Sequence, residues 1–397
     1  MSNNLPNTFF TDLKQELGAI TQYWKDFSVD NENGGFIGQR DHYNTMIPHA
    51  SKGIILNARI LWSFSAIANY DADYDLNPLM ERSFNYLYDF FRDREHGGVF
   101  CELSATGEPI IKKKQIYAQA FVIYALSEYY LNTQNKQAKD WAIELFDLIE
   151  KHAFDTKKDG YIEAFEADWS PIADMRLSDK DQNAAKTMNT HLHVLEAYTT
   201  LYKIYPEERV KSALDNLIKL FLEKFLNSES NFELFFDTDW NLTSDIVSFG
   251  HDIEALWLLI EAAKSSGNRD LLLKTQEIAV AVADKFLEYG YLKNKGVLNE
   301  KERGTGKIDT DRHWWPQAEA MVGLFYANEI KSDSRYTEAI LDIWNFTKEY
   351  IIDSKNGEWF FRVDENFEPY KSEDKLGMWK CPYHNSRACI VLLEKLK

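Results

Sequence analysis

The sequence predicts an all-α fold, an (α/α)6 barrel in which six helical hairpins close into a toroid. Helix-like stretches alternate with short glycine-containing segments along the whole chain. Similar turn-and-strand segments return about every sixty residues, which indicates a repeat of paired helices. No low-complexity linker divides the chain. We therefore expect a single domain over residues 1–397, with short β-hairpin loops between the helices.

Twelve helices are expected from the spacing of apolar residues. The even-numbered ones are rich in apolar and small residues, as in 54–68 and 118–126, whereas the odd-numbered ones carry more charge, as in 13–25 and 140–151. We expect the even-numbered helices to form the inner ring and the others the outer ring. The expected helices lie near 8–26, 52–70, 77–93, 113–131, 135–153, 187–204, 207–226, 251–266, 270–289, 315–332, 336–352 and 385–396.

Each odd-numbered helix is followed by a turn that leads into a short strand. Five of these six segments contain glycine, which permits a tight turn. The segments are 33–36, 96–100, 159–162, 231–235, 295–298 and 356–360.

Composition limits the classes of function. The net charge of −18 argues against binding to nucleic acid or to anionic membranes, and it favours a neutral ligand. No apolar run approaches the length of about 20 residues that a membrane span needs. Cys101, Cys381 and Cys389 have no CxxC spacing, and the N-terminus has no basic region followed by an apolar run. We expect a cytoplasmic monomer without a metal or another cofactor.

Polar side chains recur in the first turns of the expected inner helices. His251, Glu254 and Trp257 are three residues apart and share a helix face behind Gly250, where we expect a turn. A base, a carboxylate and an aromatic ring on one face suit a small-molecule site. A solvated acid and a core tryptophan at an ordinary helix start would explain this stretch equally well.

The sixth helix presents Asn189, His193 and Glu196 on one face. Residues two apart on a helix point in different directions, so His191 should pack behind this face and cannot chelate a metal together with His193. We take His193 as the cavity residue, although a core histidine would fit the local pattern too.

The tenth helix begins with Trp315 and Pro316, and Glu319 lies one turn further along. His384 lies where the chain enters the last helix. A tryptophan at a helix mouth suits stacking on the C–H face of a sugar ring. His384 and His251 would then approach a central cavity from two different helices.

Helices two and four add three polar groups. Arg59 lies among apolar residues and needs either a carboxylate or a ligand oxygen as a partner. Tyr117 and Gln119 place a phenol and an amide at the same level. Both groups bind sugar hydroxyls, but both are also common in protein cores.

Two imidazoles with carboxylates and an arginine suit proton transfer at a carbon next to a carbonyl. One base removes the proton and the other returns one to the opposite face, while cationic groups hold the enediolate oxygen. The sequence lacks the GxGxxG, Walker, HExxH and GxSxG patterns, which argues against a nucleotide, a metal and a hydrolase nucleophile. The carboxylates Glu254 and Glu319 leave glycoside hydrolysis open.

The chain resembles the N-acylglucosamine 2-epimerase superfamily and, within it, the cellobiose 2-epimerase family. The resemblance runs from about residue 10 to the C-terminus, with Arg59 on the second helix. Its motifs occur in the family's order at 189–198, 250–255, 314–320 and 379–385.

This resemblance implies an (α/α)6 barrel that interconverts glucose and mannose at the reducing end of β-1,4-linked disaccharides (cellobiose, mannobiose or lactose) without a cofactor. It implies that His251 and His384 are the acid/base pair at C2 and that His193 acts at the ring-opening oxygens. Other roles implied by the resemblance are oxygen binding by Arg59 and Asn189, orientation by Glu254 and Glu319, stacking by Trp315 and Trp379, and lining by Trp257 and Tyr117.

Other activities remain open from the sequence. An aldose–ketose isomerase uses the same enediolate but returns the proton to C1, and an N-acylglucosamine 2-epimerase differs in substrate alone. A glycoside hydrolase or lyase using Glu254 and Glu319 would cleave the disaccharide. A catalytically silent sugar-binding or protein-binding toroid would bind without exchanging the C2 proton.

Overall fold

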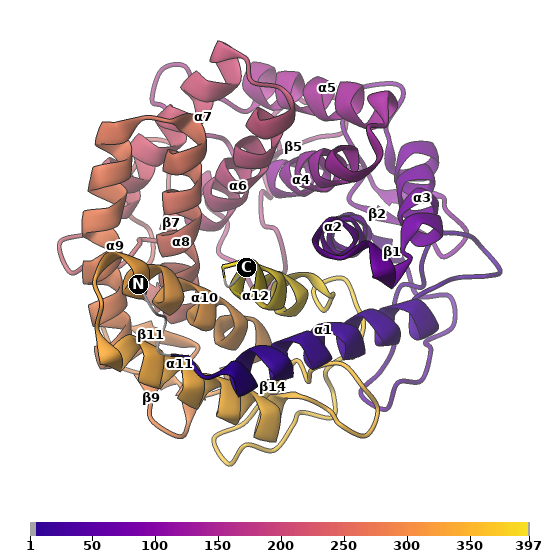
Figure 1. Cartoon of the computed structure of the whole chain (residues 1–397). Helices are drawn as coiled ribbons and strands as arrows, with labels where there is room; N and C mark the ends of the chain where they lie inside the picture. The colour runs from indigo at the N-terminus through magenta and orange to yellow at the C-terminus, as the bar shows by residue number, and fades with distance from the viewer. Residues whose placement is uncertain (1–4, 396–397) are drawn as a thin grey trace.

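The computed structural model describes residues 5–395, and in this range twelve α-helices form two concentric rings, as predicted (Figure 1). The inner helices are α2 (Ile54–Tyr70), α4 (Ile116–Thr133), α6 (Met188–Ile204), α8 (Phe249–Ser266), α10 (Trp314–Ile330) and α12 (Tyr383–Glu394). The outer helices are α1 (Asn7–Phe27), α3 (Asn77–Tyr86), α5 (Lys136–His152), α7 (Glu208–Leu220), α9 (Arg269–Tyr289) and α11 (Ser334–Phe346).

The inner ring is closed because each inner helix contacts the next and α12 contacts α2. Inner helices are buried on all sides, and in α2 every residue from Ile54 to Ala68 is buried. An outer helix buries one stripe, as in α5, where Ala138, Trp141, Ala142 and Leu145 face the core. The predicted division into apolar inner and charged outer helices is therefore confirmed. None of the described helices is long and apolar enough to cross a membrane.

Short strands join the N-terminal ends of the inner helices. Five strands that lead into an inner helix pair antiparallel with a strand further along the chain, in the pairs β1–β2, β4–β5, β6–β7, β8–β11 and β13–β14. The bridge between Arg40 and Leu376 closes this circle. The strands are β1 (Lys52–Gly53), β2 (Glu102–Leu103), β3 (Pro109–Ile111), β4 (Lys114–Gln115), β5 (Ala164–Phe165), β6 (Lys186–Thr187), β7 (Phe235–Phe236), β8 (Ile246–Ser248), β9 (Tyr291–Leu292), β10 (Gly296–Val297), β11 (Glu300–Glu302), β12 (Ile308–Asp309), β13 (Arg312–His313) and β14 (Arg362–Val363).

The predicted turn-and-strand segment follows each outer helix. Pairs of a buried lysine and a buried or half-buried aspartate, which the sequence analysis did not predict, fix four of these segments within the described chain. The aspartate accepts hydrogen bonds from two backbone N–H groups of its turn, and the lysine comes from the approach to an inner helix. The pairs are Lys52–Asp30 at 2.8 Å, Lys114–Asp93 at 2.5 Å, Lys186–Asp155 at 3.0 Å and Lys375–Asp353 at 2.8 Å.

Two local expectations need correction. Gly250 does not make a turn, because α8 begins at Phe249 and includes it. Its role is close approach: a Cβ at Gly250 would lie 2.4 Å from Cη2 of Trp315. Three outer helices end in a turn of π-helix, at Leu87–Phe91, Phe221–Phe225 and Thr347–Ile351, where we expected regular helix.

Candidate active site

Polar and aromatic side chains from the N-terminal halves of the inner helices and from the segment that precedes α12 converge in two layers. The first layer is half-buried and contains Asn189, His251, Trp315 and Trp379. The second layer is buried and contains Arg59, Tyr117, His193, Glu196, Glu254, Trp257, Glu319, His384 and Arg387. All eleven residues predicted for the site belong to these layers, and the half-buried layer lies nearer to solvent.

His384 and Glu319 form the shortest contact between an imidazole and a carboxylate in the site. Nδ1 of His384 lies 2.6 Å from Oε1 of Glu319. The other oxygen of Glu319 accepts a hydrogen bond of 3.0 Å from the indole Nε1 of Trp257. Because the carboxylate fixes Nδ1, the opposite ring nitrogen of His384 is left to act on a ligand.

Arg387, which the sequence analysis did not select, connects the carboxylates. Its Nη2 donates to Glu254 at 2.6 Å and to Glu319 at 2.7 Å, and its Nη1 donates to Glu196. All four side chains are at most 3% exposed. One guanidinium therefore compensates three buried carboxylates that come from three different helices.

His193 has a carboxylate partner of its own. Its Nδ1 lies 3.0 Å from Oε2 of Glu196, and Glu196 also accepts a hydrogen bond of 2.6 Å from the hydroxyl of Tyr383. Tyr117 packs edge-on against the His193 ring at 5.0 Å between centroids. The predicted pairing of His193 with Glu196 along one helix face is thus present.

His251 has a neutral partner instead. Its Nδ1 lies 2.8 Å from the hydroxyl of Ser248, and its ring lies 4.8 Å from the Trp315 ring. Trp315 also lies 5.6 Å from the ring of His384. This tryptophan therefore adjoins both imidazoles that were predicted to act at C2.

Burial determines the resting protonation of the histidines. It lowers the pKa of His251 to about 3 and that of His193 below its usual range, although Glu196 opposes the shift at His193. Burial, together with Arg59 and Arg387, holds the pKa of His384 well below its usual range. The three imidazoles are therefore neutral at pH 7 and available as bases.

The carboxylates respond in opposite directions. Burial and the neighbouring Glu319 raise the pKa of Glu254. Burial also opposes ionisation of Glu196, but Arg387 and His193 outweigh it, so the pKa of Glu196 lies below its usual range. Glu196 is therefore charged at neutral pH, whereas Glu254 readily keeps a proton.

Arg59 has no carboxylate partner among the described residues. Its Nη2 donates to the hydroxyl of Tyr117 at 2.8 Å, and its guanidinium lies over the rings of Phe121 and Tyr383 at 4.2 and 4.7 Å. The buried Nε of Arg59 and Oδ1 of Asn189 have no hydrogen-bond partner in the described structure. The Nε–H of Arg59 is free to donate to a ligand oxygen, and Oδ1 of Asn189 is free to accept from a ligand hydroxyl.

Two residues near the predicted site serve the fold instead. His191 packs behind the site, as predicted: its Nε2 accepts a hydrogen bond of 2.9 Å from the N–H of Tyr161. The amide of Gln119, which we considered for sugar binding, accepts from the N–H of Val99 in the same way at 2.9 Å. Neither side chain is available to a ligand.

The ligand atoms of Glu254, Glu319 and His384 lie within 4.8 Å of one another, a spacing that could hold a metal ion. Nη2 of Arg387 already donates to both carboxylates. The guanidinium thus supplies the positive charge at this point.

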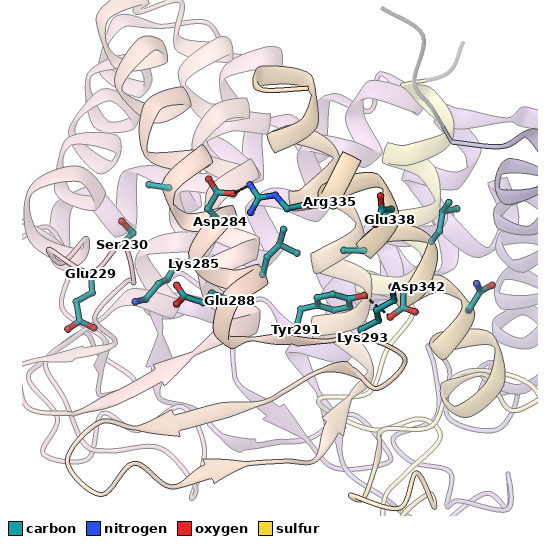
Figure 2. Close-up of a pocket in the computed structure, with 15 residues that line it drawn as sticks. Glu229, Ser230, Asp284, Lys285, Glu288, Tyr291, Lys293, Arg335, Glu338 and Asp342 are labelled. Atoms are coloured by element: carbon teal, nitrogen blue, oxygen red, sulfur yellow. Dashed lines mark hydrogen bonds and ion pairs between the residues drawn. The ribbon is translucent and has the colours of Figure 1, made fainter. Parts of the chain in front are cut away.

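A surface groove of about 1000 Å³ lies between α9 and α11 and contains none of the site residues. It is lined by Asp284, Arg335 and Asp342 among others (Figure 2).

Sequence reasoning missed Arg387, Tyr383 and Ser248, and it placed Glu196 on the correct face without giving it a role. The argument used for Arg59, that an arginine among apolar residues needs a partner, applies equally to Arg387 in the apolar last helix. No sequence signal identified Ser248 or Tyr383.

Comparisons with known proteins agree with this geometry. The profile of the family described as N-acylglucosamine 2-epimerase (GlcNAc 2-epimerase) matches residues 35–388. A cellobiose 2-epimerase of Bacteroides fragilis is 44% identical over 387 residues, which cover 96% of this chain and 98% of that relative. The structure of a cellobiose 2-epimerase from Bacillus thermoamylovorans superposes with a TM-score of 0.94 at 38% identity, covering 98% of this chain and 100% of the other. A D-mannose isomerase structure shares the fold, with a TM-score of 0.84 at 21% identity and 97% and 98% coverage.

Proposed function

Because the chain belongs to the N-acylglucosamine 2-epimerase family and is a carbohydrate epimerase, we propose that its substrate is a β-1,4-linked disaccharide such as cellobiose. The reaction interconverts glucose and mannose at the reducing end by inverting C2. The observation that carries the proposal is the pair of imidazoles, His251 and His384, whose rings lie 4.8 and 5.6 Å from the ring of Trp315.

The first step opens the reducing-end ring, because the C2 proton is acidic only next to a free aldehyde. His193 relays a proton from the anomeric hydroxyl to the ring oxygen, and Glu196 behind it stabilises the imidazolium that forms in between. Arg59, whose Nε–H has no partner, donates to the aldehyde oxygen, and the unpartnered Oδ1 of Asn189 accepts from a neighbouring hydroxyl of the sugar.

The second step moves the C2 proton. One neutral imidazole removes it, the C–H electron pair enters the enediolate, and the developing oxyanion is stabilised by Arg59. The other histidine takes up a proton from solvent and delivers it to the opposite face of C2, and the first histidine then releases its proton to solvent, so both imidazoles return to the neutral form. The Glu319 carboxylate stabilises an imidazolium at His384, whereas at His251 the partner is the neutral hydroxyl of Ser248.

The aromatic residues hold the substrate. Trp315 and Trp379 are half-buried, and their rings would stack on the sugar faces. Trp257 lies deeper, since its indole N–H is already bonded to Glu319. Its role is to support that carboxylate, and Tyr117 supports Arg59 in the same way.

Glycoside hydrolysis fits the geometry less well. A hydrolase needs two carboxylates that flank the scissile bond, one of them free to protonate the leaving oxygen. Glu254 and Glu319 are both 1% exposed and share one nitrogen of Arg387. They lie on the same side of the site and behind His384.

Proton NMR of cellobiose incubated with the enzyme in D2O tests the function. We expect glucosyl-mannose with deuterium at C2. Deuterium at C1 of a ketose would indicate an isomerase, free glucose would indicate a hydrolase, and an unchanged spectrum would refute the substrate.

His251→Ala and His384→Ala should each abolish turnover while thermal unfolding stays cooperative. Substantial activity in either variant would refute the two-base assignment.

We also propose that the enzyme works in a reducing cytoplasm. This proposal is supported by the three cysteines, Cys101, Cys381 and Cys389, which are all free thiols.

A further inference from the structure

Arg387 lies at the centre of the buried layer and contacts the partners of two histidines that have different tasks. Through Glu196 it reaches His193, and through Glu319 it reaches His384. His193 and His384 come from helices on different sides of the ring. No other cation among the described residues forms an ion pair with these carboxylates.

We propose that Arg387 is a positioning residue that holds His193 and His384 in one fixed arrangement, so that ring opening and proton transfer at C2 share a single anchor. This inference rests on the proposed epimerase function. Arg387 touches neither the substrate oxygens nor C2, and it acts only through the carboxylates behind the two imidazoles.

The number and direction of its hydrogen bonds support this role. Three carboxylates require three donated hydrogen bonds, and Arg387 supplies them from its two terminal nitrogens. The planar guanidinium also packs against two aromatic rings, with its central carbon 4.7 Å from the Trp257 ring centroid and 4.2 Å from that of Tyr383. Lysine has the same charge but offers donors from one nitrogen, so it cannot fix all three carboxylates in the same geometry.

A second cavity gives access to Arg387 from behind. It has a volume of about 360 Å³, and Arg387, Glu196 and Trp257 line one end of it. Lys203 and Glu394, at the C-terminal ends of α6 and α12, line the other end and are exposed. The cavity therefore opens at the end of the barrel opposite the half-buried layer, and Nε of Arg387 is a buried donor without a partner.

This access allows a chemical rescue experiment. In Arg387→Ala, we expect kcat to fall by about 10- to 100-fold, the range found when a group that orients a metal-ligating histidine is removed. KM should change little, because the substrate contacts remain. Guanidinium ion at millimolar concentration should enter the second cavity, occupy the vacated position and raise kcat without competing with the sugar.

Arg312→Ala is the matched control. Arg312 is 3% exposed, and its guanidinium donates to the backbone carbonyl of Lys295 in an outer hairpin. Guanidinium should not raise kcat in this variant. Rescue of both variants, or rescue of the melting temperature of Arg387→Ala without any rise in kcat, would overturn the proposal and leave Arg387 a purely structural residue.

A measurement without substrate separates this inference from the proposed function. Loss of Arg387 removes a positive charge that lowers the pKa of both His193 and His384, so NMR titration should show both pKa values raised. The other charged groups that face these imidazoles are Arg59, Glu196, Glu254 and Glu319, and all four are retained in the variant. Unchanged titration of both rings would overturn the proposal even if the enzyme acts on another sugar.

Arg387→Lys covers the case in which the alanine variant fails to fold. It retains the charge in the buried layer, so we expect it to fold with a reduced kcat and a nearly unchanged KM. A folded lysine variant with the wild-type kcat would overturn the proposal, because the charge alone would then suffice.

Discussion

Replacing Glu319 by glutamine tests how the site orients His384. The carboxylate accepts three hydrogen bonds: from His384 and Arg387 at one oxygen and from Trp257 at the other. A glutamine has one acceptor oxygen and one NH2 group. In either orientation of the amide, its NH2 therefore faces an N–H donor.

The size of the effect follows from the bonds lost. A hydrogen bond to a charged group contributes about 1.5–3 kcal/mol. If that stabilisation is expressed at the transition state, kcat falls by about 10- to 150-fold, at 1.36 kcal/mol for each factor of ten. KM should change less, because Glu319 lies behind His384 and is 1% exposed.

The assay measures kcat and KM for C2 epimerisation, with the melting temperature recorded for each variant. Glu150→Gln is the matched control: Glu150 is another carboxylate that accepts two hydrogen bonds from tyrosines, Tyr161 and Tyr198, at 2.8 Å each. Both hydrogen bonds end on one oxygen of Glu150, so the oxygen of a glutamine can accept them, and we expect the control variant to keep the wild-type kcat. A wild-type kcat in Glu319→Gln would refute the orienting role.

Three further predictions concern positions outside the reacting groups. Gly250→Ala should lower kcat/KM because its Cβ would lie 2.4 Å from Trp315. Gly18→Ala is the control: the nearest atom to its Cβ is 4.0 Å away, so it should raise the free energy of unfolding in denaturant by about 1 kcal/mol through the higher helix propensity of alanine in α1. Lys114→Met should lower the free energy of unfolding by about 3–5 kcal/mol because it leaves Asp93 buried and unpaired. Lys158→Met, the control, removes an exposed ion pair and should change the free energy of unfolding little. His191→Gln should keep both stability and kcat, because Gln119 makes the equivalent hydrogen bond; a large loss of activity would assign His191 to the site.

Periodicity was sufficient to predict the arrangement of the helices. An inner helix such as α2 is apolar around its whole circumference and an outer helix such as α5 along one stripe, and this difference is visible in the sequence. The π-helical ends of α3, α7 and α11 could not be predicted, because the extra residue in the turn depends on packing against the following hairpin. The lysine–aspartate pairs were missed for a similar reason, since their partners are distant in sequence, as Lys114 and Asp93 are.

Helical spacing limited the prediction of the site to residues that share one helix. Helical spacing identified which side chains share a face, which was enough to separate His193 from His191. It could not identify partners on other helices, and this is why Arg387 was overlooked although three predicted or noted carboxylates depend on it. A count of buried charges would have helped: three inner-ring glutamates require a nearby cation, and Arg59 does not contact them.

The barrel explains how residues of the same type acquire different tasks. On four inner helices, a polar side chain in the first turn points outward and accepts a backbone N–H from the adjacent hairpin: Gln119, His191, Asp252 and Gln317. Side chains at neighbouring positions on the same turns, such as His193 and His251, point inward to the site. Glutamine, histidine and aspartate all serve the outward position, because it requires only an acceptor. The inward positions require a base with a defined proton and a partner behind it, so the site should tolerate substitution far less than the hairpins do.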